Sequence, residues 1–148
     1  MSERRLGMDK KELVGLALKA RERSYCPYSG FAVGAALLCS SGKVYLGCNV
    51  ENASFGATLC AERTAAAKAV SNGEQLFISI AIMGCKQGAA PGESDFSYPC
   101  GVCRQVLREF AAPGMKVYVA QTPDDILSTT LEDLLPHSFG PEHLTGPD

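Results

Sequence analysis

The chain has 148 residues, of which 46% are hydrophobic and 20% charged, and its formal net charge at pH 7 is −2. This length and composition are typical of one globular domain, which we expect to span residues 1–148. The small net charge and the lack of a basic stretch argue against a nucleic-acid polymer as partner or substrate. Apolar runs are too short for a membrane span, and the polar start of the chain lacks the apolar region of a signal peptide.

The first third of the chain predicts one helix and a hairpin of two strands. Asp9, followed by a glutamate three residues later, is typical of a helix N-terminus, and apolar residues at helical spacing extend this helix to about Ser24. Residues 31–38 are almost all apolar, as expected of a strand that is buried on both faces. A turn at 40–42 and a second strand over 43–48 complete the hairpin.

The rest of the chain alternates helices and strands. We expect Ile78, Ile80 and Ile82 to share one face of their strand, and Val102 to lie on the buried side of its helix. The long irregular connection over 85–98 is typical of a functional or mobile loop. The predicted elements are a helix over 60–71, a strand over 76–83, a helix over 100–111, strands over 115–120 and 126–130, and a short helix over 131–135.

This order of elements predicts an α/β fold. We expect a three-layer α/β/α sandwich with a mixed sheet of about five strands. A strand, a helix and a further strand in succession indicate a parallel crossover. The N-termini of the two helices that follow the long polar loops should then meet at one end of the sheet, where such folds place their ligand sites.

Two short motifs supply three thiols and one carboxylate. The first runs from Cys60 through Glu62 to Arg63, and the second contains Cys100 and Cys103 after a proline. Three thiolates can hold Zn²⁺ and leave its fourth tetrahedral position open for water, and an unligated carboxylate nearby can move protons. A lone Cys-x-x-Cys motif would leave a structural zinc site, a redox site and a catalytic zinc site about equally open. The first motif, upstream of it, shifts the balance to a catalytic zinc site.

The spacing within each motif places both at helix N-termini. Cys100 and Cys103 lie three residues apart and share one face of a helix. Cys60 and Glu62 can face one metal only if Cys60 lies at the cap or in the first turn. Helix N-termini offer partial positive charge to the thiolates, and Arg63 can donate further hydrogen bonds to them. His137 and His143 show no ligand spacing, so we do not expect either to close the site.

These motifs and several further blocks resemble the small homotetrameric, zinc-dependent cytidine deaminases, in which a cysteine replaces the histidine of the wider deaminase signature. The resemblance runs from about Tyr25 to Pro141. The blocks that carry it are residues 25–29, 31–36, 47–53, 60–65, 99–105, 134–136 and 138–141.

The resemblance implies hydrolytic deamination of cytidine and deoxycytidine in pyrimidine salvage, with one Zn²⁺ per chain. Cys60, Cys100 and Cys103 would hold the metal and Glu62 would act as base and then acid. A polar loop after a strand is often only a solvated turn, but the resemblance implies that Asn49 and Glu51 bind the ribose hydroxyls. It likewise implies that the ring of Phe31 packs on the pyrimidine, that the backbone of Ala61 binds the amide edge of the base, and that Arg63 supports the thiolates.

The resemblance also implies a homotetramer whose active sites are shared between protomers. Phe55 and Phe139 would reach into the site of a neighbour, and Tyr28 would lie at the interface beside it. Ser54 and Phe55 stand where some relatives have Cys and Tyr, and Tyr98 stands where a smaller Ser is common, so the fine substrate preference stays open.

The four remaining cysteines are expected to be reduced and buried, which predicts a cytoplasmic protein. Two other interpretations are a structural zinc module that binds a protein partner and a deaminase of a different substrate, such as an aminonucleoside antibiotic or a base within RNA. The metal motif is shared with antibiotic deaminases, whereas Asn49 and Glu51 favour a ribonucleoside.

Overall fold

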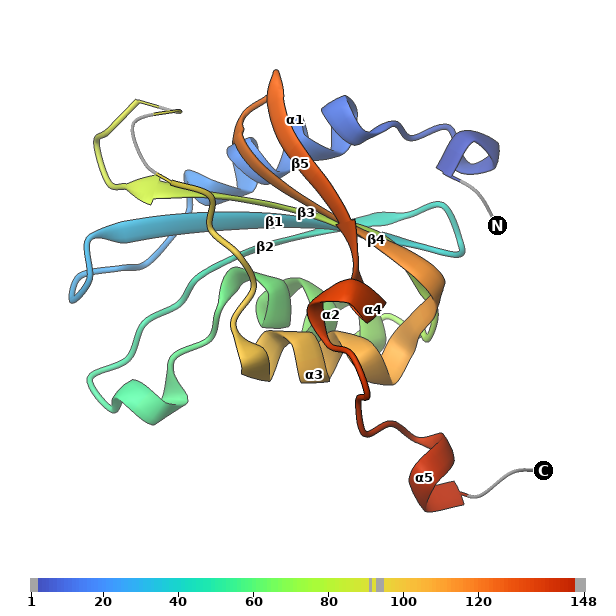
Figure 1. Cartoon of the computed structure of the whole chain (residues 1–148). Helices are drawn as coiled ribbons and strands as arrows, with labels where there is room; N and C mark the ends of the chain where they lie inside the picture. Colours follow the sequence, from blue (N-terminus) through green and yellow to red (C-terminus); the bar gives the residue numbers. More distant parts are fainter. Residues whose placement is uncertain (1–2, 91, 93–94, 146–148) are drawn as a thin grey trace.

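The computed structural model describes residues 3–90, 92 and 95–145 (Figure 1). The described elements are η1 (Glu3–Leu6), α1 (Lys10–Arg21), β1 (Phe31–Cys39), β2 (Val44–Cys48), η2 (Phe55–Ala57), α2 (Ala61–Ser71), β3 (Phe77–Lys86), α3 (Gly101–Phe110), β4 (Ala111–Thr122), β5 (Asp125–Thr130), α4 (Leu131–Leu134) and α5 (Glu142–Thr145).

The described strands form one mixed five-stranded sheet in the order β2-β1-β3-β4-β5. Strand β1 is antiparallel to both β2 and β3, β3 is parallel to β4, and β4 is antiparallel to β5. Strands β2 and β3 therefore run in the same direction, with β1 between them and α2 as their connection. The predicted mixed sheet and the predicted parallel crossover are both confirmed.

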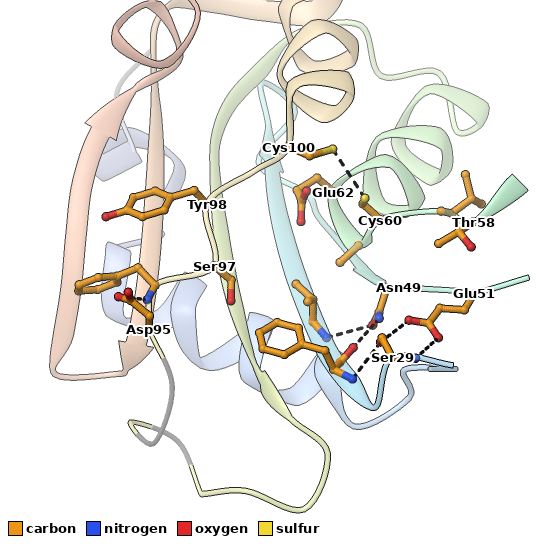
Figure 2. Close-up of a pocket in the computed structure, with 15 residues that line it drawn as sticks. Ser29, Asn49, Glu51, Thr58, Cys60, Glu62, Asp95, Ser97, Tyr98 and Cys100 are labelled. Atoms are coloured by element: carbon orange, nitrogen blue, oxygen red, sulfur yellow. Dashed lines mark hydrogen bonds between the residues drawn. The ribbon is translucent and has the colours of Figure 1, made fainter. Parts of the chain in front are cut away.

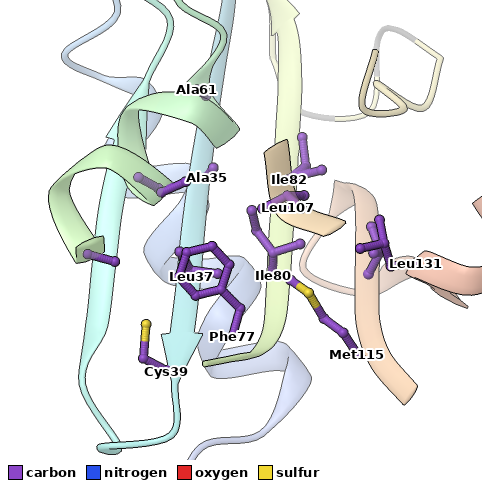
Figure 3. Packing of buried hydrophobic residues seen from close by; sticks show 14 of the residues in the cluster. Ala35, Leu37, Cys39, Ala61, Phe77, Ile80, Ile82, Leu107, Met115 and Leu131 are labelled. Atoms are coloured by element: carbon purple, nitrogen blue, oxygen red, sulfur yellow. The ribbon is translucent and has the colours of Figure 1, made fainter. Parts of the chain in front are cut away.

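Helices cover both faces of this sheet. Helix α1 lies on one face, and α2 and α3 lie together on the other (Figure 1). The core is accordingly divided into two clusters of buried side chains. One packs Leu37 and Ile80 of the sheet against α2 and Leu107 of α3 (Figure 3). The other packs Leu38 against Leu13 and its neighbours on α1. Burial of each such side chain contributes about 1.5–3 kcal/mol, so the two clusters fix the three layers that we expected.

Helix α1 starts where the sequence predicts and ends earlier. The carboxylate of Asp9 accepts a hydrogen bond of 2.9 Å from the backbone N–H of Glu12, which caps the helix. The helix ends at Arg21 and not at Ser24. The backbone N–H of Ser24 bonds three residues back to Arg21, and its hydroxyl donates to the carbonyl of Val33 on β1. The last turn is therefore tightened and tied to the sheet.

The prediction that three isoleucines share one face of β3 is wrong. Ile80 and Ile82 pack on the side of α2 and α3, whereas Ile78 packs on the side of α1. The pairing of β3 with both of its neighbours is irregular between Phe77 and Ser79. A bulge of this kind inserts one residue and thereby exchanges the faces of the side chains beyond it.

The same irregularity lengthens β4. Phe77 pairs with Ala111, but Ser79 pairs with Lys116, so the residues between those two partners bulge out of the ladder. The strand consequently begins directly after α3 and not at residue 115. The prediction for Val102 is also wrong, because this side chain is 58% exposed and the inward side of α3 carries Cys103 and Leu107.

Helix α2 lies unusually close to the sheet at Gly47 of β2. A Cβ atom at this position would lie 2.4 Å from the carbonyl oxygen of Ala61 and 2.5 Å from the amide nitrogen of Ala65. Only glycine allows this approach. The contact fixes the first turn of α2, on which the candidate site is built. Among the described residues, no helix is long and apolar enough to cross a membrane.

Candidate functional site

The three cysteines of the two motifs meet at the N-termini of α2 and α3. Cys60 is the N-cap of α2, with φ −71° and ψ 156°, and Cys100 is the N-cap of α3, with φ −68° and ψ 167°. Cys103 lies in the first turn of α3 and is buried. The extended backbone of each N-cap turns its sulfur away from the helix body. The prediction that both motifs lie at helix N-termini is confirmed.

The sulfur atoms are spaced as a tetrahedral metal site requires. Cys60 Sγ lies 3.8 Å from Cys100 Sγ, which lies 3.4 Å from Cys103 Sγ, and all three lie within 4.8 Å of one another. Zinc–sulfur bonds of about 2.3 Å in tetrahedral geometry place sulfurs about 3.8 Å apart. The three thiols therefore fit one Zn²⁺ ion. His137 and His143 are not members of this group among the described residues.

The Cys60 sulfur lies among hydrogen-bond donors that favour its thiolate form. Its interactions with the thiol of Cys103 and with the guanidinium of Arg63 lower the pKa of the Cys60 thiol to about 5. Arg63 Nη2 donates to Cys60 Sγ at 3.6 Å and to the carbonyl oxygen of Thr58 at 3.1 Å, which holds the guanidinium beside the sulfur. Cys60 is thus ionised at neutral pH, the state in which a thiol binds a metal.

Glu62 is a buried carboxylate beside the thiols. Only 4% of its surface is exposed, and burial raises the pKa of Glu62 to about 7. Glu62 is the second residue of α2, and its side chain points into the cavity that Cys60 and Cys100 also line (Figure 2). A carboxyl group with a pKa near neutrality can both accept and return a proton, as general acid–base chemistry requires.

The cavity itself has a volume of about 630 Å³. Figure 2 shows Cys60, Cys100 and Glu62 at one end, with Asn49, Glu51 and Ser29 at the other. Its size and its mixed lining suit a small organic molecule with polar groups at both ends. The lining residues are Ser29, Phe31, Val33, Asn49, Glu51, Thr58, Leu59, Cys60, Ala61, Glu62, Asp95, Phe96, Ser97, Tyr98 and Cys100.

Asn49 is fixed by the first residues of β1. Its amide oxygen accepts from the N–H of Val33 at 2.9 Å, and its amide nitrogen donates to the carbonyl of Phe31 at 2.8 Å. These two bonds orient the amide of a residue that is only 8% exposed. One donor hydrogen and one acceptor lone pair of the amide remain for a ligand.

Glu51 is held in a comparable way. Its Oε1 atom accepts from the backbone N–H groups of Tyr28 and Ser29, each at 3.0 Å, and its Oε2 atom accepts from the Ser29 hydroxyl. The Ser29 side chain, its backbone and that of Tyr28 hold the pKa of Glu51 below its usual range, against a small opposing effect of desolvation. Glu51 therefore presents a stable anion at the edge of the cavity.

The remaining predicted residues divide between this cavity and the outer surface. Phe31 and Ala61 line the cavity, and the absence of a side chain at Gly84 leaves room for the Phe31 ring, since a Cβ there would lie 3.0 Å from Cε1. Tyr28 and Phe55 instead line a smaller neighbouring cavity, with their ring centroids 5.8 Å apart.

Phe139 is not among the residues that line the cavity described above. Its ring is 56% exposed and stacks on His143, with the centroids 5.2 Å apart. The backbone carbonyl of Phe139 accepts from Gln105 on α3 at 3.0 Å, and the Ser138 hydroxyl accepts from Arg108 at 2.7 Å. The tail after α4 is thus attached to α3 and presents the Phe139 ring outward.

Two parts of the cavity were not identified from the sequence. Residues 95–98 form one wall, and the ring of Tyr98 lies 6.2 Å from that of Phe96. The only sequence signal was the length of the 85–98 connection. Ser29 was also missed, although it lies in a block that carries the resemblance, because a serine in a turn has no distinctive pattern.

The comparisons with known proteins agree with this geometry. The family model described as the cytidine and deoxycytidylate deaminase zinc-binding region matches residues 8–120. A curated cytidine deaminase of Sporosarcina psychrophila is 45% identical over 138 residues, which cover 93% of this chain and 96% of that protein. A cytidine deaminase of Halalkalibacterium halodurans is 44% identical over 137 residues, which cover 93% of this chain and 98% of that protein.

Solved structures give the same result. The crystal structure of cytidine deaminase from Burkholderia pseudomallei has a TM-score of 0.79 and 43% identity, covering 89% of this chain and 100% of that one. The crystal structure of cytidine deaminase from Mycobacterium tuberculosis has a TM-score of 0.75 and 38% identity, covering 90% of this chain and 98% of that one. With its paired helix N-termini, three thiols and buried carboxylate, the chain belongs to the zinc-dependent cytidine deaminase family.

Proposed function

We propose that this chain hydrolyses cytidine and deoxycytidine to the corresponding uridine product and ammonia, as in pyrimidine salvage. The observation that carries the proposal is the convergence of Cys60, Cys100, Cys103 and Glu62 at one end of a cavity whose other end presents a fixed amide and a fixed carboxylate. The groups at the two ends suit a nucleoside, with an amine to be removed at one end and sugar hydroxyls at the other.

Cys60, Cys100 and Cys103 would hold the zinc ion. When bound, Zn²⁺ supplies Lewis acidity that lowers the pKa of water enough for hydroxide to form near neutral pH. Arg63 and the two helix N-termini withdraw negative charge from the three sulfurs, which keeps the centre electrophilic despite its thiolate ligands.

Glu62 moves the protons. It removes a proton from the attacking water while the oxygen adds to C4 of the cytosine ring, and it delivers that proton to N3. It then transfers the remaining hydroxyl proton to the amino group, so that the C4–N bond breaks, ammonia leaves and C4 becomes a carbonyl. Burial and a pKa near 7 support this role, because the group must act as base and as acid in one turnover.

The rest of the cavity orients the nucleoside. The ring of Phe31 packs on the pyrimidine, and such a contact contributes about 0.5–1.5 kcal/mol beyond area burial. The backbone of Ala61 bonds the amide edge of the base. Asn49 and Glu51 bind the sugar hydroxyls, with the acceptor and donor capacity that their contacts with β1 and the preceding turn leave free.

We also propose a homotetramer with shared sites, located in the cytoplasm. Tyr28, Phe55 and Phe139 are 53%, 74% and 56% exposed in the single chain, and large exposed aromatic side chains are typical of interfaces. Phe55 and Phe139 would complete the site of a neighbouring protomer. All seven cysteines lie in the described part of the chain and are free thiols, which supports a reducing compartment.

Loss of the cytosine absorbance tests the proposal. Zinc-saturated protein is expected to turn over cytidine and deoxycytidine, to lose that activity on chelation and to regain it when zinc is returned. Blasticidin-type nucleosides and cytosine within RNA serve as competing substrates. Turnover of one of these in place of cytidine would contradict the substrate assignment. Stable zinc binding without turnover of any substrate would indicate a structural zinc module.

A further inference from the structure

The turn before β1 contains a serine whose hydroxyl connects two parts of the cavity. Ser29 Oγ donates to Oε2 of Glu51 and accepts from the backbone N–H of Phe31 at 3.0 Å (Figure 2). A hydroxyl has a single hydrogen, and the N–H of Phe31 occupies one of its lone pairs. The hydrogen is therefore directed to the carboxylate and not to solvent.

This hydroxyl belongs to a continuous network. The backbone N–H of Phe31 donates to the Ser29 hydroxyl, and the carbonyl of Phe31 accepts from the amide nitrogen of Asn49 at 2.8 Å. Glu51 is bound on one oxygen by two backbone N–H groups and on the other by Ser29 alone among the contacts that the described residues provide. The two backbone bonds hold Oε1, and the serine hydroxyl holds Oε2.

We propose that Ser29 is a positioning residue for nucleoside binding, which orients the Glu51 carboxylate so that it accepts a sugar hydroxyl. The inference rests on the proposed function, in which Glu51 binds the sugar. Ser29 does not touch the reacting atoms, so it affects binding of the sugar and not the chemical step. The hydrogen bond is charge-assisted, which makes it stronger than a neutral one.

A purely structural serine would behave differently. Ser29 is exposed, and removal of an exposed hydroxyl changes stability little, so Ser29→Ala is expected to melt within about 2 °C of the unsubstituted protein. The chain also contains a matched control. Ser41 Oγ donates to Glu74 at 2.7 Å and accepts from the N–H of Lys43, two residues on, but it lies in the turn after β1, outside the cavity lining.

Steady-state kinetics of the zinc-saturated protein test the assignment. Ser29→Ala is expected to raise KM for cytidine about tenfold and to change kcat less than about threefold. Ser29→Thr keeps the hydroxyl and is expected to restore KM to within about threefold of the original value. Ser41→Ala should leave both constants unchanged.

Two further comparisons separate positioning of Glu51 from other effects. In a Glu51→Gln background, Ser29→Ala is expected to change KM less than about twofold, since its partner is already altered. With 2′,3′-dideoxycytidine, which lacks the hydroxyls that face Glu51, Ser29→Ala should likewise leave KM unchanged.

The assignment is overturned if Ser29→Ala leaves KM for cytidine unchanged. It is also overturned if Ser29→Ala raises KM for 2′,3′-dideoxycytidine as much as KM for cytidine. A rise in KM of about tenfold on Ser29→Ala in the Glu51→Gln background would also overturn it. So would unfolding of Ser29→Ala at the assay temperature. Absence of cytidine turnover by the unsubstituted, zinc-saturated protein would contradict the proposed function and this inference together. Normal turnover with an unaffected Ser29→Ala variant would remove this inference alone.

Discussion

At Glu51, a single surface turn favours the charged form of a carboxylate that lines the cavity. Its pKa is lowered, chiefly by the Ser29 side chain and then by the Ser29 backbone. A lowered folded-state pKa means that the carboxylate stays ionised as the pH falls past the value at which an ordinary glutamate takes up a proton. The end of the cavity that Glu51 lines should therefore keep its charge in mildly acidic solution.

This leads to a prediction about pH. On acidification from neutral pH, we expect KM for cytidine to begin to rise at a lower pH in the unsubstituted protein than in Ser29→Ala, because the Ser29 hydrogen bonds lower the pKa of Glu51. The measurement is a profile of log(1/KM) against pH for both proteins. Loss of zinc at low pH reduces the number of active sites and so lowers apparent kcat and not KM. Superimposable profiles would contradict the expected coupling between Ser29 and Glu51.

Single residues also set the limit of what the sequence alone predicts. The placement of the thiols and of Glu62 follows from spacing, because a helix N-terminus has few ways to bring Cys60 and Glu62 toward one point. Ile78 and Val102 were misplaced, since a bulge reverses the faces of a strand without any change in hydrophobicity. Ser29 was missed because its importance depends on a partner 22 residues away.

At the level of elements, the site depends on how closely α2 approaches β2. The first turn of α2 carries both Cys60 and Glu62, and it lies against the backbone of Gly47. A shift of this helix would move Cys60 and Glu62 together, and with them the proposed metal ligand and the proposed proton-transfer group. The glycine is thus part of the support of the site, although it is remote from the substrate.

Gly47→Ala is expected to destabilise the fold and weaken zinc binding. A Cβ only 2.4 Å from a backbone oxygen forces the helix away, and overpacking of this kind costs about 1–3 kcal/mol or more. Chemical denaturation and a competitive zinc titration measure the two effects. Gly15→Ala, in the exposed part of α1 where a Cβ meets no atom within 4 Å, is the control and should stabilise by about 0.5–1 kcal/mol. Equal stability of both variants would contradict the close-contact explanation.

The predicted elements were confirmed where hydrophobic pattern and capping agree. Examples are the Asp9 cap of α1, the strand β1 that is buried on both faces, and the two cysteine N-caps. The boundaries of β3 and β4 were not predicted, because the register of a strand depends on its neighbours in the sheet and not on its own residues.

At the level of the whole molecule, the single chain brings the three thiols and Glu62 to one end of the cavity and Asn49 and Glu51 to the other. Phe55 contacts Tyr28 and Phe139 stacks on His143, but both phenylalanines stay largely exposed in the single chain. The tail that carries Phe139 is held by Gln105 and Arg108 of α3, which presents the ring outward. Shared sites therefore remain a prediction that mixing of variants can test.

Mixing Glu62→Gln with Phe139→Ala protomers is expected to restore activity that each variant lacks. After subunit exchange at equal amounts, about a quarter of the sites combine an intact Glu62 with an intact Phe139 from a neighbour. The measurement is turnover before and after exchange, with sedimentation to establish the tetramer. As a control, Glu62→Gln mixed with Cys100→Ala should give no recovery, because both residues come from the same chain in every site. A fully active monomer, or no recovery in the first mixture, would contradict the sharing of sites.

The most direct test of the whole account is the Glu62→Gln substitution, with zinc content and cytidine turnover measured on the same sample. We expect one zinc per chain to be retained, because the three sulfurs are unaltered, and we expect kcat to fall by about 10²–10⁴-fold or more. Retained zinc with retained turnover would show that Glu62 does not transfer the protons. Loss of zinc would show that the carboxylate is a metal ligand, and either result would contradict a site formed by three thiols and one unligated acid.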